Sequence, residues 1–164
     1  MESDLHDLFL DELADMLHAE KQITKALPKL IKAVESDELR GALEDHLEET
    51  QNQISRIEEV FATLDEKSKT KACKGMQGIL EEGEEMLTEM KGTAALDASV
   101  IAGAQKVEHY EIASYGTLVA WAEEMGHDKA TQLLKESLDE EKAADERMTE
   151  IAESLANERA EREA

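Results

Sequence analysis

Several glutamates of this sequence occupy positions where a helix would place buried apolar side chains. Glu20 falls at helical spacing between Leu17 and Leu27, so its carboxylate points where these leucines point. Glu108 and Glu111 are three residues apart, which puts both on one helical face. These inward carboxylates are the side chains of the sequence best placed for chemistry.

Two further stretches repeat this placement. Glu49 shares a helical face with His46 and Gln53, and Glu141 shares one with Asp145. For any single glutamate, the competing interpretation is a boundary position from which the carboxylate reaches water. Four stretches that carry acids at matching depth favour one shared, buried site.

Buried carboxylates in this number need positive charge nearby. An ionised carboxylate in an apolar core is very unfavourable unless it is paired or bound to a metal, and few basic residues fall on these faces. Divalent cations meet the requirement, and oxygen-rich ligands suit iron or manganese. The sequence therefore predicts a divalent metal site.

Long helices must position these residues. Ala, Leu, Glu and Lys dominate the sequence and favour helix, and apolar stripes of period 3.6 mark four stretches. Pro28 lies inside the first of them, where its missing N–H predicts a kink rather than an end. The predicted helices cover residues 4–34, 37–64, 94–125 and 128–155.

Loop lengths predict how these helices connect. Short turns at residues 35–36 and 126–127 make two antiparallel helical hairpins. Residues 65–93 are long enough to cross back along a bundle, and we expect a short extra helix within them, over residues 75–90. The predicted fold class is therefore all-α, a ferritin-like four-helix bundle with one long crossover. Each hairpin brings one pair of acidic helices, the duplication expected of a two-metal bundle.

A single domain is predicted over residues 1–156, followed by a frayed charged tail over residues 157–164.

The net charge of the sequence limits its function. The 164 residues include 40 acidic and 18 basic ones, a net charge of −22 that repels nucleic acid. The acidic excess runs along the whole chain, which favours adaptation to a salty, halophilic cytoplasm over solubility alone.

Cellular location follows from what the sequence contains. Cys73 is the only cysteine, so no intrachain disulfide is possible and a reducing compartment is expected. The N-terminus has neither the basic nor the apolar segment of a signal peptide, and no apolar run approaches the length of a membrane span. We expect a cytoplasmic protein without a membrane partner.

Four strings of the sequence carry a family resemblance. They are AEKQ from Ala19, HLEET from His46, QKVEHYEIASYG from Gln105 and DEEKAAD from Asp139, and the third is long and specific. With these strings the sequence resembles, over about residues 4–155, the YciF/YciE-type proteins, which are small bacterial and archaeal ferritin-like proteins associated with stress.

This resemblance implies a rubrerythrin-like two-metal arrangement with iron as the first expectation and manganese as the second. Such sites use a Glu, a Glu followed by His, a Glu-x-x-Glu pair, and a second Glu followed by His. Both histidines are missing here: Asn52 and Gln53 follow Glu49, and Asp145 follows Glu141. Oxygen ligation by the replacements is then expected, which favours harder metals. The predicted ligands are Glu20, Glu49, Gln53, Glu108, Glu111, Glu141 and Asp145.

Other residues near these motifs receive lesser roles. His46 and His109 are interpreted as packing residues or as supports for the ligands, with ligation as the alternative. Tyr115 lies a turn beyond Glu111 and is expected near the site, and Tyr110 is the second candidate tyrosine.

Two functions fit these observations. The first is a di-metal carboxylate protein that reacts with oxygen or peroxide, a small oxidant, in oxidative or general stress. The second is a non-enzymatic stress protein, a helical scaffold or metal-binding interaction module, because a fold does not fix a function. A homodimer is also predicted, from an apolar stripe formed by Met76, Ile79, Met86 and Met90 in the crossover.

Overall fold

The computed structural model describes residues 4–162, and all regular structure within them is helical. The prediction of an all-α chain is therefore confirmed for this part of the sequence. The long helices begin and end within a few residues of the predicted limits. The elements are α1 (Leu5–Ala33), α2 (Asp37–Thr63), α3 (Lys74–Met90), α4 (Leu96–Glu124), α5 (Asp128–Ile151), a π-helical turn (Ala152–Ala156) and α6 (Asn157–Arg162).

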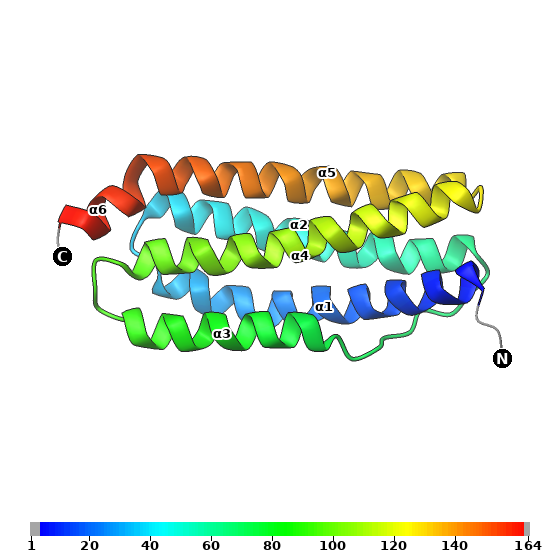
Figure 1. Cartoon of the computed structure of the whole chain (residues 1–164), viewed down its shortest axis with the longest axis horizontal. Helices are drawn as coiled ribbons and strands as arrows, with labels where there is room; N and C mark the ends of the chain where they lie inside the picture. Colours follow the sequence, from blue (N-terminus) through cyan, green and yellow to red (C-terminus); the bar gives the residue numbers. More distant parts are fainter. Residues whose placement is uncertain (1–3, 163–164) are drawn as a thin grey trace.

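The helices lie side by side along one long axis (Figure 1). α1 packs on α2 and α4 packs on α5, as expected of two hairpins, and α2–α5 and α1–α4 contacts join them. α3 lies in the connection between α2 and α4 and packs against α4 and α1. The interior between the long helices is the apolar core, whose largest buried side chains include Tyr115, Phe9 and Phe61.

The turn between α1 and α2 is fixed from another helix. Asp97 at the start of α4 is buried, and its carboxylate accepts hydrogen bonds from the backbone N–H groups of Glu35, at 2.9 Å, and Ser36, at 2.8 Å. The Ser36 hydroxyl caps α2, and Arg40 donates to the backbone carbonyls of Ile31 and Val34 at the end of α1. The two hairpins are therefore aligned by hydrogen bonds as well as by packing.

α1 continues through Pro28 to Ala33, so the proline does not end the helix, and the kink stays a prediction. Gly126 has φ 71°, a left-handed conformation that ends α4 with little strain because glycine has no Cβ.

The crossover helix α3 is tied to the bundle by Cys73. Its thiol accepts the backbone N–H of Met76 and lies 3.1 Å from the Tyr110 hydroxyl, which also bonds to Asp15. Gly75 allows this close approach, since a Cβ at this position would lie 2.8 Å from the Tyr110 ring.

Substituting Gly75 with alanine should therefore destabilise the protein by about 1–3 kcal/mol, because the added methyl must displace the ring. Gly78 lies one turn on in the same helix and has open space at its Cβ. Gly78→Ala should stabilise by about 0.5–1 kcal/mol through helix propensity. Urea unfolding of both variants checks the pair, and equal effects on unfolding free energy would contradict the packing argument.

α5 is followed by the π-helical turn and then by α6, which covers Asn157–Arg162. Fraying of the charged tail stays a prediction. Residues 163 and 164 lie outside the described residues.

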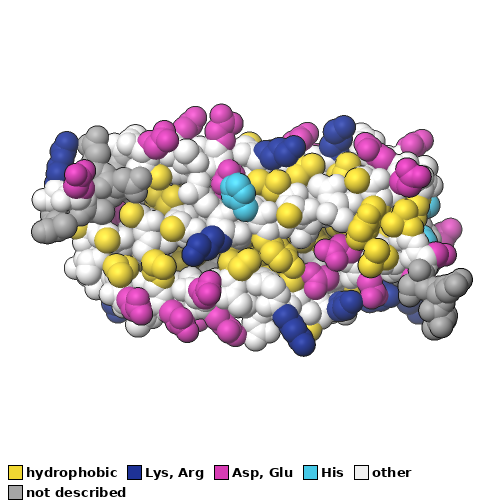
Figure 2. Space-filling model, viewed as in Figure 1, with side chains coloured by type: hydrophobic (Ala, Val, Ile, Leu, Met, Phe, Trp, Pro, Cys, Tyr) yellow, Lys and Arg dark blue, Asp and Glu magenta, His cyan; other side chains and the backbone are white. Residues whose placement is uncertain are grey.

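The apolar stripe in α3 is less exposed than expected. Met76 is fully buried against the bundle, and Ile79, Met86 and Met90 are half-buried. Acidic side chains are spread over the length of the face seen in Figure 2, with apolar atoms between them. The homodimer stays a prediction. Among the described residues, no helix combines the length and apolarity that crossing a bilayer requires.

Candidate metal centre

Four helices bring ionisable side chains into the middle of the core. Glu20 comes from α1, His46 from α2, Glu108 and Glu111 from α4, and Glu141 from α5. The four glutamates have no exposed surface, and His46 is 2% exposed. Each helix places its acid on the inward face because the neighbouring turns carry leucine, isoleucine or valine at the same spacing.

His46 lies among these carboxylates. Its Nδ1 is 3.7 Å from Glu108 Oε1, and its Nε2 is 3.7 Å from Glu141 Oε1 and 3.9 Å from Glu111 Oε1. One ligand atom each from His46, Glu111 and Glu141 lie within 4.8 Å of one another. These distances are longer than hydrogen bonds, so the groups face a common point without satisfying one another.

The buried polar atoms of the cluster lack hydrogen-bond partners. This holds for both carboxylate oxygens of Glu20, Glu108, Glu111 and Glu141 and for both ring nitrogens of His46. The Tyr115 hydroxyl is buried next to them and also lacks a hydrogen-bond partner. Buried polar groups are nearly always hydrogen-bonded in proteins. The cluster offers many carboxylate oxygens and one imidazole as ligands. A hard or borderline divalent metal ion fits that donor set.

The pKa values of the clustered side chains are shifted by burial and by their mutual charges. Burial raises the pKa of Glu108 to about 8, and burial together with the Glu141 charge raises the pKa of Glu111 well above its ordinary value. Burial also raises the pKa of Glu20. For His46, burial opposes the charged form, but the surrounding carboxylates outweigh it and raise its pKa to about 9. Burial alone would raise the pKa of Glu141, yet the adjacent His46 lowers it.

The remaining predicted ligands lie at the edge of the cluster. Gln53 is fully buried, with its Nε2 donating to Glu140 at 3.0 Å and its Oε1 unpaired. Glu49 is half-buried, and burial raises its pKa. Asp145 is half-buried and faces α4, where its Oδ1 lies 3.1 Å from His109 Nε2. The structure thus brings Gln53 close to the buried group but leaves Glu49 and Asp145 partly in solvent.

His46 is not among the predicted ligands, although ligation is the alternative role given to it. Its ring nitrogens lie 3.7–3.9 Å from oxygens of Glu108, Glu111 and Glu141, whereas Glu49 is half-buried. The signal available in the sequence is its spacing, because His46 follows Leu39 by seven residues and Leu43 by three on one helical face. Of the two tyrosines, Tyr115 adjoins the cluster, whereas Tyr110 bonds to Cys73 and Asp15 outside it.

Comparison with known proteins gives these residues a family context. The family described as a domain of unknown function, DUF892, matches residues 4–161. Protein YciF of Escherichia coli (strain K12) is 46% identical over 161 residues, which are 98% of this chain and 97% of YciF. The crystal structure of YciF, described as a stress protein, matches with a TM-score of 0.90 at 45% identity and covers 95% of this chain and 99% of its own.

Two further solved structures are similar. YcfI from Rhodopseudomonas palustris, described as a candidate structural protein, is 46% identical with a TM-score of 0.87, over 90% of this chain and 94% of its own. A protein from Xanthomonas campestris pv. campestris is 26% identical with a TM-score of 0.75, over 98% of this chain and 99% of its own. The similarity therefore extends over nearly the whole chain.

Proposed function

This chain belongs to the YciF-type family described as DUF892, and from its buried carboxylates we propose that it is a ferritin-like di-metal protein. It binds iron, or alternatively manganese, and reacts with oxygen or peroxide in the cytoplasm under stress. The stress assignment is supported by the description of YciF as a stress protein. The metal assignment is supported by the chemistry of the cluster.

The observation that carries the proposal is the set of orphaned atoms at the centre of the core. Four glutamates and one histidine are buried with no hydrogen-bond partner among the described residues. Burying several carboxylates together without compensation is strongly unfavourable. A site of this kind is retained when a bound cation compensates it, since metals are the usual partners of clustered buried carboxylates.

The position of each residue suggests its role in such a site. Glu20, Glu108, Glu111, Glu141 and His46 would hold the metals, and an iron or manganese pair would supply redox chemistry toward a small oxidant. The carboxylates provide the negative charge that holds the cations. The buried aliphatic side chains around them exclude bulk water, which strengthens the electrostatic interactions inside.

Metal binding should release protons from the cluster. Glu108, with a pKa of about 8, and His46, with a pKa of about 9, hold protons near neutral pH and must lose them to act as ligands. Between pH 6 and pH 8, each proton released on binding should therefore raise the affinity for Mn²⁺ by about tenfold per pH unit. Calorimetric titration in buffers of different ionisation enthalpy measures the number of protons, and a value of zero would contradict this assignment of ligands.

Turnover tests the proposed activity. Protein purified without chelators should consume hydrogen peroxide, and the reduced protein should consume dioxygen. The rate of either reaction should follow the metal content of the protein. Protein stripped with chelator and reloaded serves as the matched control. Metal-loaded protein that consumes neither oxidant would contradict the redox proposal.

A non-enzymatic scaffold is the second candidate, favoured by the description of YcfI as a candidate structural protein. In that case the cluster would be a structural metal site or an interaction module, and the protein would act as a homodimer or with a partner. The same turnover measurement separates the two, since a scaffold keeps its metal without consuming oxidant.

A further inference from the structure

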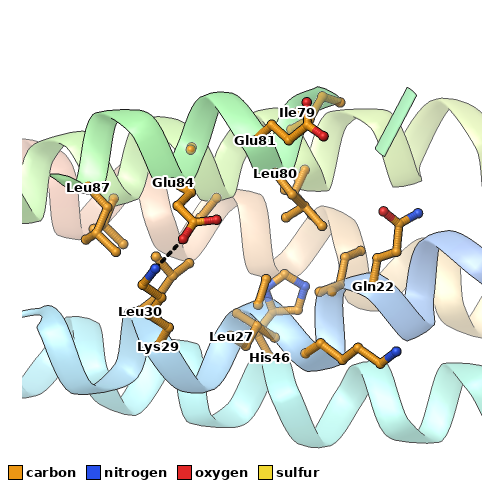
Figure 3. A pocket seen from close by; sticks show the side chains of 18 of the residues that line it. Gln22, Leu27, Lys29, Leu30, His46, Ile79, Leu80, Glu81, Glu84 and Leu87 are labelled. Carbon is orange, nitrogen blue, oxygen red and sulfur yellow. Dashed lines mark hydrogen bonds and ion pairs between the residues drawn. The ribbon is translucent and has the colours of Figure 1, made fainter. Parts of the chain in front are cut away.

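A cavity of about 370 Å³ lies between the crossover helix and the bundle (Figure 3). This volume falls in the range of roughly 300–1,000 Å³ that is typical of small-molecule sites. Its walls come from residues 22–30 of α1, 77–87 of α3 and 99–107 of α4. The cavity therefore exists because α3 covers α1 and α4 without filling the space between them.

The cavity is elongated and largely apolar. Its lining follows helices that lie side by side for up to ten residues or so, which corresponds to a length of roughly 12–15 Å. Leucines line it on both sides, with Leu27 and Leu30 on α1 facing Leu80 and Leu87 on α3 (Figure 3). A long, narrow, apolar space suits an unbranched alkyl chain better than a compact polar molecule.

Charged groups at its edge give the cavity polarity. Lys29 pairs with Glu84 across the opening, which joins α1 to α3 (Figure 3). Lys25 also lines the cavity, one turn from the Gln22 amide, and makes no ion pair or hydrogen bond within residues 4–162. In a chain with a net charge of −22, an unpaired cation beside an apolar cavity is a complementary site for an anionic head group.

The inner wall of the cavity includes His46. The opposite side of this imidazole faces the buried carboxylates, 3.7 Å from Glu108 and Glu141. A molecule in the cavity would therefore contact His46 without entering the carboxylate cluster.

We propose that this cavity binds an alkyl carboxylate, with its chain along the leucines of α1 and α3 and its carboxylate on Lys25. A second copy of the chain is a poorer occupant, because a protein partner needs an open apolar face. Among the described residues, Leu8 is the large hydrophobic side chain that is exposed, and it does not line the cavity. The binding goes beyond the proposed metal function and does not depend on it.

Calorimetric titration of the full chain with decanoate and with decanol tests the proposal, in metal-loaded and in chelator-treated protein. Both probes should bind saturably at one site per chain. Lys25→Gln should weaken decanoate binding by about fivefold and leave decanol binding unchanged, as expected for an exposed charge pair. Lys106→Gln is the matched control, because Lys106 is exposed on α4 and does not line the cavity.

Filling the cavity provides the second test. Ala104 and Ala26 line it from α4 and α1, and Ala104→Leu or Ala26→Leu should weaken both probes by at least about tenfold because the added side chain occupies their space. Two variants are used so that the test does not depend on the folding of one substituted protein, and circular dichroism and thermal melting report whether each variant folds. The absence of saturable binding, unchanged binding in a folded filled variant, or an equal effect of Lys25→Gln on both probes would overturn the proposal.

Discussion

Replacing Glu108 with glutamine should stabilise the metal-free protein and remove most of its stabilisation by divalent metal. Glu108 is fully buried, and burial raises its pKa from an ordinary 4.5 to about 8. The folded state at pH 7 therefore carries the cost of keeping this carboxyl protonated or of burying its charge. Glutamine has the same shape and no charge, so the substitution should raise the unfolding free energy by about 2 kcal/mol.

The same substitution should have the opposite effect when metal is present. A metal that binds the native state alone stabilises it by about 2.7 kcal/mol at a free concentration of 100 times its Kd. Removing a central ligand should eliminate most of this gain, so that the variant melts at the same temperature with Mn²⁺ and with chelator.

Glu123 offers a matched control on the same helix. It is exposed near the end of α4, and Glu123→Gln removes one negative charge without touching the cluster. Its effect should be within about 0.5 kcal/mol, with or without metal. If Glu108→Gln destabilised the metal-free protein, or if both variants kept the full response to Mn²⁺, the buried-ligand account of Glu108 would be wrong.

The second large effect concerns pH. The metal-free protein should lose stability steadily as pH rises from about 5 to about 9, whereas the metal-loaded protein should be much less sensitive over that range. The groups responsible are Glu20, Glu108, Glu111 and His46, whose pKa values in the folded state all exceed their ordinary values.

The sign follows from proton linkage. A group with a raised pKa binds its proton more tightly in the folded state, so stability falls wherever the folded protein holds more protons than the unfolded chain. For Glu108 this window runs from its ordinary 4.5 to about 8. For His46 it runs from 6.5 to about 9, and loss of that proton alone costs roughly 3 kcal/mol. Bound metal displaces these protons and so removes the dependence.

The measurement requires high salt. Surface acids also repel one another more strongly as pH rises, but 1 M NaCl shortens that repulsion to about 3 Å and leaves the buried groups nearly unaffected. Chemical unfolding in 1 M NaCl at several pH values, with Mn²⁺ or with chelator, isolates the cluster. A flat pH profile for the metal-free protein would show that these side chains are not buried together.

The arrangement of the helices was largely accessible from the sequence. Short turns are strong local signals, so Ser36 and Gly126 marked helix boundaries that the structure has within a few residues. Asp97 was not identified, because its role is to accept N–H groups from a turn some sixty residues away, and nothing local in the sequence encodes that contact.

The site was accessible in part, for a related reason. Helical periodicity places Glu20, Glu108 and Glu141 on inward faces, and the structure buries all three. Periodicity defines a face only coarsely, so it could not rank Glu49 against His46, which occupy adjacent turns of α2. Which of them reaches the centre depends on how α2 is rotated against α4 and α5, a tertiary property.

We propose that two metal ions occupy the core between α1, α2, α4 and α5. Anomalous diffraction from crystals of Mn²⁺-loaded protein, recorded near the manganese edge, locates such ions. We expect two strong anomalous peaks per chain, enclosed by the side chains of Glu20, His46, Glu108, Glu111 and Glu141. Peaks confined to surface carboxylates, or none within the core, would contradict it.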